Sequence, residues 1–454
     1  MAELPAAESP ATDSPTSGLR HNKNWQLLWL GQSISITGNY IFDTTVVLWI
    51  ATIIARGKPW GPAAVGGVLI AAAVPALIVG PVAGVFVDRW NRRRIMMTSD
   101  VCSAALIASL LVLPAFGSHL SAAIKLGMIY AVVALAASFT QFFAPSRAAI
   151  IQSVVAADDR VRAMGLLQSM ASFAAIVGPP LAAPLLFVFG VQWALVIDAA
   201  SFLVSFAAIW TMRLPSAEHL APSARPGFRR EFAAGLRFFR SSPVLVALAI
   251  GVVVATFGAG AINVLMVYFL KVNLHSAPRW LGTLDAAEGA GAIVGALLAG
   301  WIAAKVGSGR AFWGGLVVCG VVLIVLSRAT SLPVALAIMA CIGLALGPVN
   351  VLVGALLLGA TPQEMLGRVT SVISPMQQLA SVLSMAGVGF LASTALRGFN
   401  TRVGGMSFGP YDVIFAGCGL VFVAAGLAVI RPLRARSDSA SPEPTTEVAG
   451  QPVT

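Results

Sequence analysis

Charged residues are scarce in this chain. Only 10% of its 454 residues are Asp, Glu, Lys or Arg, whereas 58% are hydrophobic. Ordinary soluble domains are about 25% charged and about 45 to 50% apolar. This composition excludes a soluble enzyme of two or three domains, because water cannot be the only solvent of such a chain.

Cysteine and histidine are also rare, with four residues of each. The cysteines stand alone in apolar stretches, without CxxC spacing or a histidine at ligand spacing, so we expect neither a disulfide framework nor a metal site. The sequence has no G-x-x-x-x-G-K-S/T segment for a nucleotide phosphate and no Ser/His/Asp grouping for catalysis. It therefore predicts no enzyme activity and no cofactor.

Long apolar runs, by contrast, are abundant. A helix needs about 20 apolar residues to cross a hydrocarbon core about 30 Å thick. By this measure the sequence predicts an all-α integral membrane protein with twelve transmembrane helices, over residues 25–54, 62–86, 95–114, 123–144, 164–190, 192–212, 244–270, 281–304, 311–328, 332–358, 369–396 and 411–431. Many transporters consist of two related halves around a central site, so we expect two pseudo-symmetric bundles of six helices.

Composition shifts divide the chain into five segments. The sequence predicts a disordered cytoplasmic tail over 1–23, an N-terminal bundle over 24–213, a cytoplasmic linker over 214–243, a C-terminal bundle over 244–432 and a second disordered tail over 433–454. Both tails are polar and rich in Pro and Ser, and the first has no apolar core of the signal-peptide type. In the linker, Phe228, Phe232, Leu236 and Phe239 recur at helical spacing among arginines, which predicts an amphipathic helix on the membrane surface.

The positive charges indicate the orientation. Lys and Arg number 29 against 18 Asp and Glu, and 21 of the 29 fall at cytoplasmic ends if the N-terminus is inside. An excess of Lys and Arg in cytoplasmic loops is the usual rule for membrane proteins. We therefore expect a protein of the cell membrane with both termini in the cytoplasm. Topology and attraction to anionic lipid explain the net positive charge, so no nucleic-acid partner is expected.

The loop after the second expected helix carries a motif, Gly84-Val-Phe-Val-Asp88-Arg89-Trp-Asn91-Arg-Arg-Arg. It resembles the loop 2-3 signature of the major facilitator superfamily, G-x-x-x-D-R/K-x-G-R-R/K, with Asn91 at a glycine position. Asn tolerates left-handed backbone angles better than most residues, so the turn stays feasible. The resemblance implies that Gly84 lets the second helix approach the eleventh and that Asp88 faces the N-terminal end of the eleventh helix, where negative charge is favoured.

A cytoplasmic gate is therefore expected. Its predicted members are Gly84, Asp88, Arg89, Arg92, Arg93, Asp100 and Arg147. The alternative is that the basic run only anchors the loop on the cytoplasmic side.

Four further segments resemble the macrolide-efflux and enterobactin-exporter branch of that superfamily: NWQLLWLGQSISITGNYIF, FAPSRAAIIQSVV, LVIDAASFLVSF and GLRFFRSSPVL. The resemblance implies the major facilitator fold, with a substrate cavity lined by the first, fourth, seventh and tenth helices. Residues 174–183, AAIVGPPLAA, are similar to the antiporter motif G-x-x-x-G-P-x-x-G-G, with Gly178 and Pro179 intact. This favours export over uptake, and ordinary helix packing is the alternative.

Acidic residues inside the expected spans are costly and are functional candidates by default. In the first helix Gln32, Ser35, Asn39 and Asp43 are spaced three, four and four, which places them on one face that we expect to line the cavity. Asp43 is the first candidate for a proton-coupling residue. The alternative is an acid that only forms structural hydrogen bonds.

The eighth expected helix carries a second acidic pair. Asp285 and Glu288 are three residues apart and share a face, so they are the next proton-coupling candidates. The alternative is that both are solvated at the helix mouth. Asp198, in a peripheral helix, is expected to be structural.

The remaining cavity candidates are polar and aromatic side chains of the expected cavity helices. The predicted substrate contacts are Gln32, Asn39, Tyr40, Phe139, Phe142, Asn263, Met266, Tyr268 and Asn350. A largely apolar lining with few polar groups suits an amphiphilic organic molecule. Such side chains also serve ordinary helix packing.

Together these features predict a secondary exporter of amphiphilic, drug-like or macrolide-like compounds that works by proton antiport and alternating access. The expected partners are a small substrate, protons and the lipid bilayer, and the expected state is a monomer. Two alternatives remain: a siderophore or lysophospholipid transporter of the same fold, and a membrane sensor that transports nothing.

Overall fold

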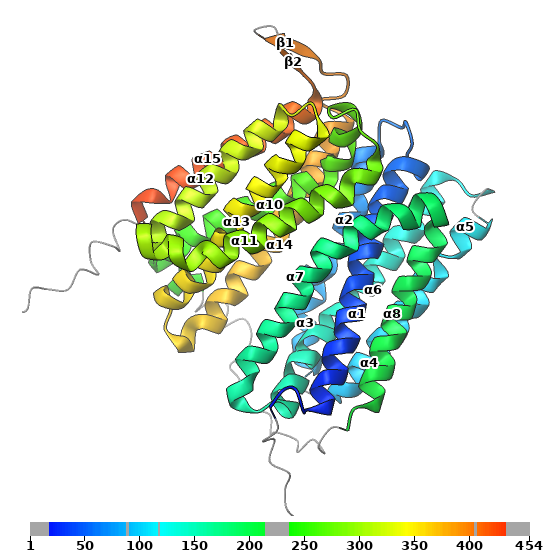
Figure 1. Cartoon of the computed structure of the whole chain (residues 1–454), viewed down its shortest axis with the longest axis vertical. Helices are drawn as coiled ribbons and strands as arrows, with labels where there is room; N and C mark the ends of the chain where they lie inside the picture. Colours follow the sequence, from blue (N-terminus) through cyan, green and yellow to red (C-terminus); the bar gives the residue numbers. More distant parts are fainter. Residues whose placement is uncertain (1–17, 88–89, 117–118, 214–235, 404–405, 433–454) are drawn as a thin grey trace, which may run out of the picture.

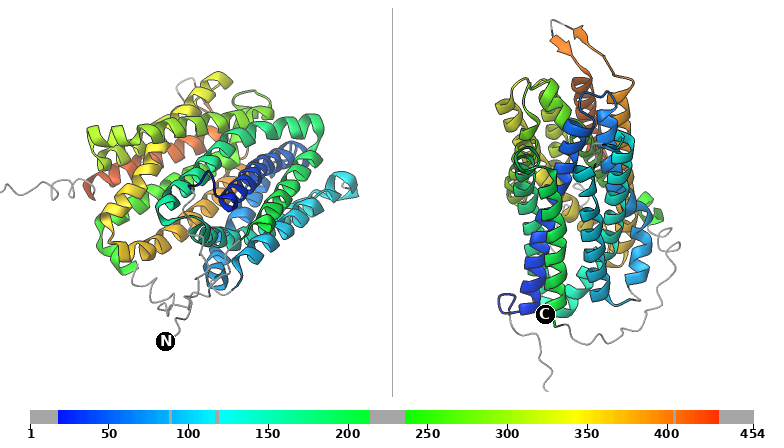
Figure 2. Two further views of the ribbon diagram at one scale, coloured as in Figure 1. Left: turned by 60° about the horizontal axis from the view of Figure 1, so that its bottom comes forward. Right: turned by 90° about the vertical axis from the view of Figure 1, so that its right-hand side faces the viewer.

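The computed structural model describes residues 18–87, 90–116, 119–213, 236–403 and 406–432. Twelve helices within these residues are long and apolar enough to cross a membrane, which confirms the predicted number. They form two bundles that lie side by side (Figure 1), and the long helices run in roughly one direction (Figure 2, right). The predicted fold class is therefore confirmed.

The N-terminal bundle holds the first six spans. Its elements are α1 (Lys23–Trp49), the π turn η1 (Ile50–Ile54), α2 (Gly61–Ile78), α3 (Gly80–Val87), α4 (Arg92–Ser109), α5 (Val112–Phe116), α6 (Ala122–Val154), the 3₁₀ turn η3 (Ala157–Asp159), α7 (Arg160–Pro184), the π turn η4 (Leu185–Phe189) and α8 (Val191–Thr211). The break between α2 and α3 follows Pro75, which lies inside α2 and has no backbone N–H to donate.

The C-terminal bundle holds the other six spans. Its elements are α10 (Pro243–Val272), the 3₁₀ turn η5 (Pro278–Trp280), α11 (Leu281–Val306), α12 (Ser308–Ser327), α13 (Leu332–Ala360), α14 (Gln363–Ser393), β1 (Thr401–Val403), β2 (Met406–Phe408) and α15 (Pro410–Ala428). The two strands pair antiparallel as a hairpin. The sequence did not predict them, because strands of three residues are too short to show alternation. We call the end of the molecule that carries this hairpin the hairpin end, and the other the opposite end.

Some helices are longer than their apolar runs. α6 continues to Val154, beyond the predicted end at residue 144, although Pro145 lies inside it. The reason is packing: Ile150, Ile151 and Val154 are buried in a second hydrophobic cluster with the start of α1. Hydropathy alone marks where the membrane ends, not where a helix ends.

The chain is also ordered earlier than predicted. Leu19 is buried, and Asn22 caps α1 by accepting a hydrogen bond from the Trp25 N–H at 3.0 Å. The Asn22 side chain also donates to the Val154 carbonyl oxygen at 2.6 Å. Residues 18–22 thus belong to the packed bundle, whereas 1–17 lie outside the described residues.

The predicted linker helix is only partly described. Residues 236–241 are helical and Phe239 is buried, but Phe228 and Phe232 lie outside the described residues, as does the tail 433–454.

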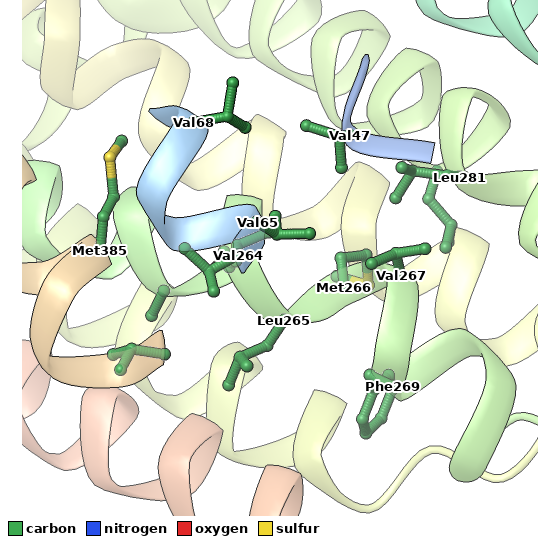
Figure 3. Close-up of a cluster of buried hydrophobic side chains, with 14 of the residues drawn as sticks. Val47, Val65, Val68, Val264, Leu265, Met266, Val267, Phe269, Leu281 and Met385 are labelled. Atoms are coloured by element: carbon green, nitrogen blue, oxygen red, sulfur yellow. The ribbon is translucent and has the colours of Figure 1, made fainter. Parts of the chain in front are cut away.

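The two bundles touch near the hairpin end. α2 packs on α14 and α7 packs on α11. Between the bundles the Ala63 N–H donates to the Ser393 hydroxyl at 3.0 Å, and the backbone of Gly389 packs beside Pro62. Figure 3 shows one buried apolar cluster made of side chains from both bundles, including Val47 of α1, Leu281 of α11 and Met385 of α14. We call the labelled side chains the apolar closure, because they are buried where the two bundles meet at that end: Val47, Val65, Val68, Val264, Leu265, Met266, Val267, Phe269, Leu281 and Met385.

Candidate functional site

Asp43 lies one turn before Val47 of the apolar closure. Its side chain is exposed, between the buried Phe42 and Thr44 of α1. Asp43 forms no hydrogen bond with any residue that the structure describes, so the alternative of a hydrogen-bonded structural acid finds no support there.

Asp285 lies beside the apolar closure in the other bundle. It lies one turn after Leu281, which also belongs to the apolar closure, and Glu288 follows on the next turn of α11. Both side chains are half-buried and interact with each other through their charges. The chain therefore places carboxyl groups of both bundles on the same side of the apolar closure.

Between these two acidic positions runs the Gly178-Pro179 pair of α7. The Cα of Gly178 packs against Tyr40 of α1, where an added Cβ would lie 2.7 Å from the Tyr40 Cβ. The carbonyl of Pro179 packs against Gly282 of α11, so closely that a Cβ there would overlap it. Because Gly282, Asp285 and Gly289 are spaced three and four, they share the face of α11 that meets α7.

Prolines shape this part of α7. Pro179, Pro180 and Pro184 each lack the N–H that would donate within the helix, and the π turn η4 follows directly. The Gly178-Pro179 motif is thus part of the contact surface between the bundles.

Asp198 is buried in α8 beside Gly38 of α1. The Ser201 hydroxyl donates to the backbone carbonyl oxygen of Asp198 at 2.8 Å and lies 3.5 Å from its carboxylate. Its charge also interacts with that of Asp43.

A buried polar chain crosses the N-terminal bundle. The Arg147 guanidinium donates to the Gln32 side-chain oxygen at 2.8 Å, and the Gln32 amide donates to the Ser205 hydroxyl at 3.1 Å. Ser205 also hydrogen-bonds to the carboxyl group of Asp100. These contacts join α6, α1, α8 and α4. Arg147 and Asp100, expected to complete the gate around Asp88, are therefore linked through Gln32 and Ser205.

The gate motif itself is described in part. Asp88 and Arg89 lie outside the described residues, whereas Gly84 is in α3 and Arg92 is half-buried at the start of α4. Arg93 donates to the carbonyl oxygens of Ile209, at 3.2 Å, and Trp210. It thereby caps the last turn of α8 in its own bundle.

Asn91 does not use the left-handed backbone that Asn would tolerate at this glycine position of the motif. Its φ of −67° and ψ of 109° are extended, and its side chain accepts a hydrogen bond from the Arg94 N–H at 3.1 Å. Asn91 is the N-cap of α4, so it stands at a glycine position of the motif for a different reason.

The predicted substrate contacts fall into four groups. Asn263 and Asn350 are exposed, and Asn39, Tyr40 and Tyr268 are half-buried. Phe139 and Phe142 line a cavity of about 640 Å³ together with Asn91 and Arg94, between α4 and α6. Gln32 and Met266 face no open space: Gln32 is in the polar chain, and Met266 belongs to the apolar closure. For these two residues the prediction of a cavity lining is wrong.

Sequence reasoning missed a polar cluster at the hairpin end. The carboxyl group of Asp412 accepts from the Gly409 N–H at 2.8 Å and from the Asn273 amide, and lies 3.7 Å from the Arg328 guanidinium. It ties together α15, α10 and α12. The signal was the acid in the first turn of α15, where helix N-termini favour negative charge.

Comparison with known proteins agrees with this architecture. The chain matches the family described as Major Facilitator Superfamily over residues 28–385 and 248–453. It is 26% identical over 281 residues to macrolide efflux protein A of Streptococcus pyogenes, covering 61% of this chain and 67% of that protein. It is 28% identical over 329 residues to the multidrug efflux pump Tap of Mycobacterium bovis, covering 71% and 77%.

Solved structures share the fold. A bacterial homologue of the iron transporter ferroportin in an inward-facing state aligns with a TM-score of 0.69 and 14% identity, over 93% of this chain and 99% of that one. A D-xylose-proton symporter aligns with a TM-score of 0.69 and 15% identity, over 90% and 97%. The chain therefore belongs to the Major Facilitator Superfamily and is a multi-pass membrane transporter rather than an enzyme.

Proposed function

We propose that this transporter exports amphiphilic organic compounds in exchange for protons. The observation that carries the proposal is the position of Asp43 and Asp285. One acid from each bundle lies one turn from the apolar closure, accessible to water and without a hydrogen bond to any described residue. Such groups are free to exchange a proton with the cavity.

The energetics favour coupling at this place. An ionised carboxylate is costly at membrane depth unless it is solvated or paired, so it gains from binding either a proton or a cationic group of a substrate. The two occupants then compete for the same carboxyl groups. When the cavity opens to alternate sides of the membrane, this competition exchanges a bound substrate for a proton.

The direction of opening follows from orientation. If the opposite end faces the cytoplasm, as the lysine and arginine distribution indicates, the structure is closed to the outside by the apolar closure. A proton from outside would load Asp43 after the hairpin end opens, while substrate leaves. The intact Gly178-Pro179 pair and the efflux function in the names of the two relatives support export.

Transport in proteoliposomes tests the proposal. The protein would be reconstituted and offered macrolides, other amphiphilic drugs, lysophospholipids and siderophores, with and without an imposed pH gradient. We expect an amphiphilic drug to move against its gradient only when a pH gradient is present. Movement of the lipid or the siderophore alone would replace the substrate class, and movement without dependence on the pH gradient would refute antiport.

A further inference from the structure

A second cavity lies at the hairpin end, between the two bundles. Its volume is about 480 Å³. One side is formed by η1 with the loop 55–58 and by η4, and the other by the end of α10 and by η5. It borders the apolar closure, since Val267 belongs to both, and none of the acidic residues described above lines it.

The polar part of this cavity is positively charged. Arg56 and Lys58 line it from the N-terminal bundle, on either side of Gly57, whose φ of +69° turns the chain there. Lys271 lines it from the C-terminal bundle. No acidic side chain lines it, and none of these three cations forms an ion pair within the described part of the chain. Three unpaired cations around one cavity repel one another and favour an anionic occupant.

The remaining wall is apolar and continues onto the surface. Ile53, Phe187 and Val272 line the cavity and are 54%, 46% and 51% exposed. At the boundary between the hydrocarbon core and the headgroups, exposed apolar side chains meet acyl chains, while Lys and Arg reach toward the lipid phosphates. A free inorganic anion has no apolar part that could pack against this wall, whereas a phospholipid has acyl chains.

Tyr268 also lines the cavity, and its hydroxyl is buried without a hydrogen-bond partner in the described structure. It stacks on Tyr411 with ring centroids 6.3 Å apart, which fixes its orientation. The hydroxyl lies beside Gly61, so it offers no exposed donor to the cavity.

We propose that this cavity binds an anionic phospholipid from the leaflet at the hairpin end, with its phosphate among Arg56, Lys58 and Lys271. Its acyl chains would lie along Ile53, Phe187 and Val272. Because the two walls belong to different bundles, the cavity is complete only while the hairpin end is closed. Bound lipid therefore stabilises the closed state relative to the open one. Neither the identity of the substrate nor the direction of transport enters this inference.

Lipid titration followed by native mass spectrometry tests it. Delipidated protein would be titrated with phosphatidylglycerol, phosphatidylcholine or inorganic phosphate. The pocket variant, Arg56→Gln with Lys271→Gln, removes one cation from each bundle. The matched control, Lys125→Gln with Arg397→Gln, also removes one cation per bundle at the hairpin end, outside the cavity.

We expect the tightest phosphatidylglycerol site to weaken by roughly tenfold or more in the pocket variant and to stay unchanged in the control. The charge-conserving variant Arg56→Lys with Lys271→Arg should retain it. Equal weakening in both Gln variants, or equal affinity for phosphatidylcholine, would overturn the proposal. Displacement of phosphatidylglycerol by inorganic phosphate at similar concentration would show a free-anion site instead.

A conformational readout keeps the test independent of variant stability. Spin labels at Val112 and Phe399, exposed positions in different bundles at the hairpin end, report the distance between the bundles. In the otherwise wild-type protein, adding phosphatidylglycerol should increase the short-distance population, and phosphatidylcholine should not. If phosphatidylglycerol leaves the distribution of distances between the spin labels unchanged, the lipid does not stabilise the closed state and the proposal is wrong.

Discussion

At the scale of single residues, the cost of placing polar groups in a membrane explains both the successes and the errors of prediction. Asp43 and Asp285 stand out in the sequence because a carboxyl group inside an apolar span requires a reason. Gln32 follows the same logic but is satisfied by Arg147 and Ser205, from helices far away in the chain. The spacing of polar residues on one helix shows that they share a face, but it does not show whether that face contacts a neighbouring helix or a cavity.

Gln32→Ala tests the buried polar chain. Removal of Gln32 leaves the Arg147 guanidinium and the Ser205 hydroxyl without this partner, so we expect a loss of about 1 to 3 kcal/mol in the free energy of unfolding. Thermal or denaturant unfolding in detergent measures the loss. Asn263→Ala, at an exposed position, should change stability by no more than about 0.5 kcal/mol. Equal effects of the two substitutions would contradict the buried chain.

Asn91 offers a direct choice between two explanations. As an N-cap, it should tolerate Asp, and tolerate Gly at a few tenths of a kcal/mol, whereas Ala should cost about 1 kcal/mol of stability. If the position required a left-handed backbone, Gly would instead be the most stable of the four residues. Unfolding of the Ala, Asp and Gly variants in detergent distinguishes the two.

At the scale of elements, the chain specifies each helix locally but not its partner in the other bundle. The Gly178-Pro179 pair was visible as a motif, and Gly282 was not, since a single glycine in an apolar span has many uses. Its role depends on the Pro179 carbonyl, which comes from the other bundle. Likewise, α6 extends beyond its apolar run because packing against α1 continues the helix.

Gly282→Ala should hinder closure of the hairpin end. The added Cβ would overlap the Pro179 carbonyl, and such overpacking of backbone costs about 1 to 3 kcal/mol. Spin labels at Val112 and Phe399 should then report a larger population of long distances. Gly300→Ala, on the same helix, meets no atom within 4 Å and serves as the control. A distance distribution like that of wild type in the Gly282 variant would rule out this contact as the closing surface.

At the scale of the whole molecule, the sequence predicts twelve helices in two halves, and the structure adds where the halves meet. Long apolar runs and short separators are enough for the first, because the bilayer dictates helix length. The place where the two halves meet is a property of one conformational state, which is stabilised by the apolar closure and by the α2-α14 and α7-α11 contacts. A transporter sequence must be compatible with more than one state, so local patterns do not select between them.

The central claim is that substrate and proton compete for the carboxyl groups beside the apolar closure. The most direct test adds a transported compound to purified protein in weakly buffered detergent and records proton release with a pH-indicator dye. We predict that the wild type releases protons when the compound binds. Asp43→Asn should reduce the number of protons released per bound compound by at least about fivefold. Asp158→Asn, at an exposed acid in η3, should release as many protons as the wild type. No release from the wild type would contradict the account, and so would undiminished release from a variant that combines Asp43→Asn with Asp285→Asn and Glu288→Gln.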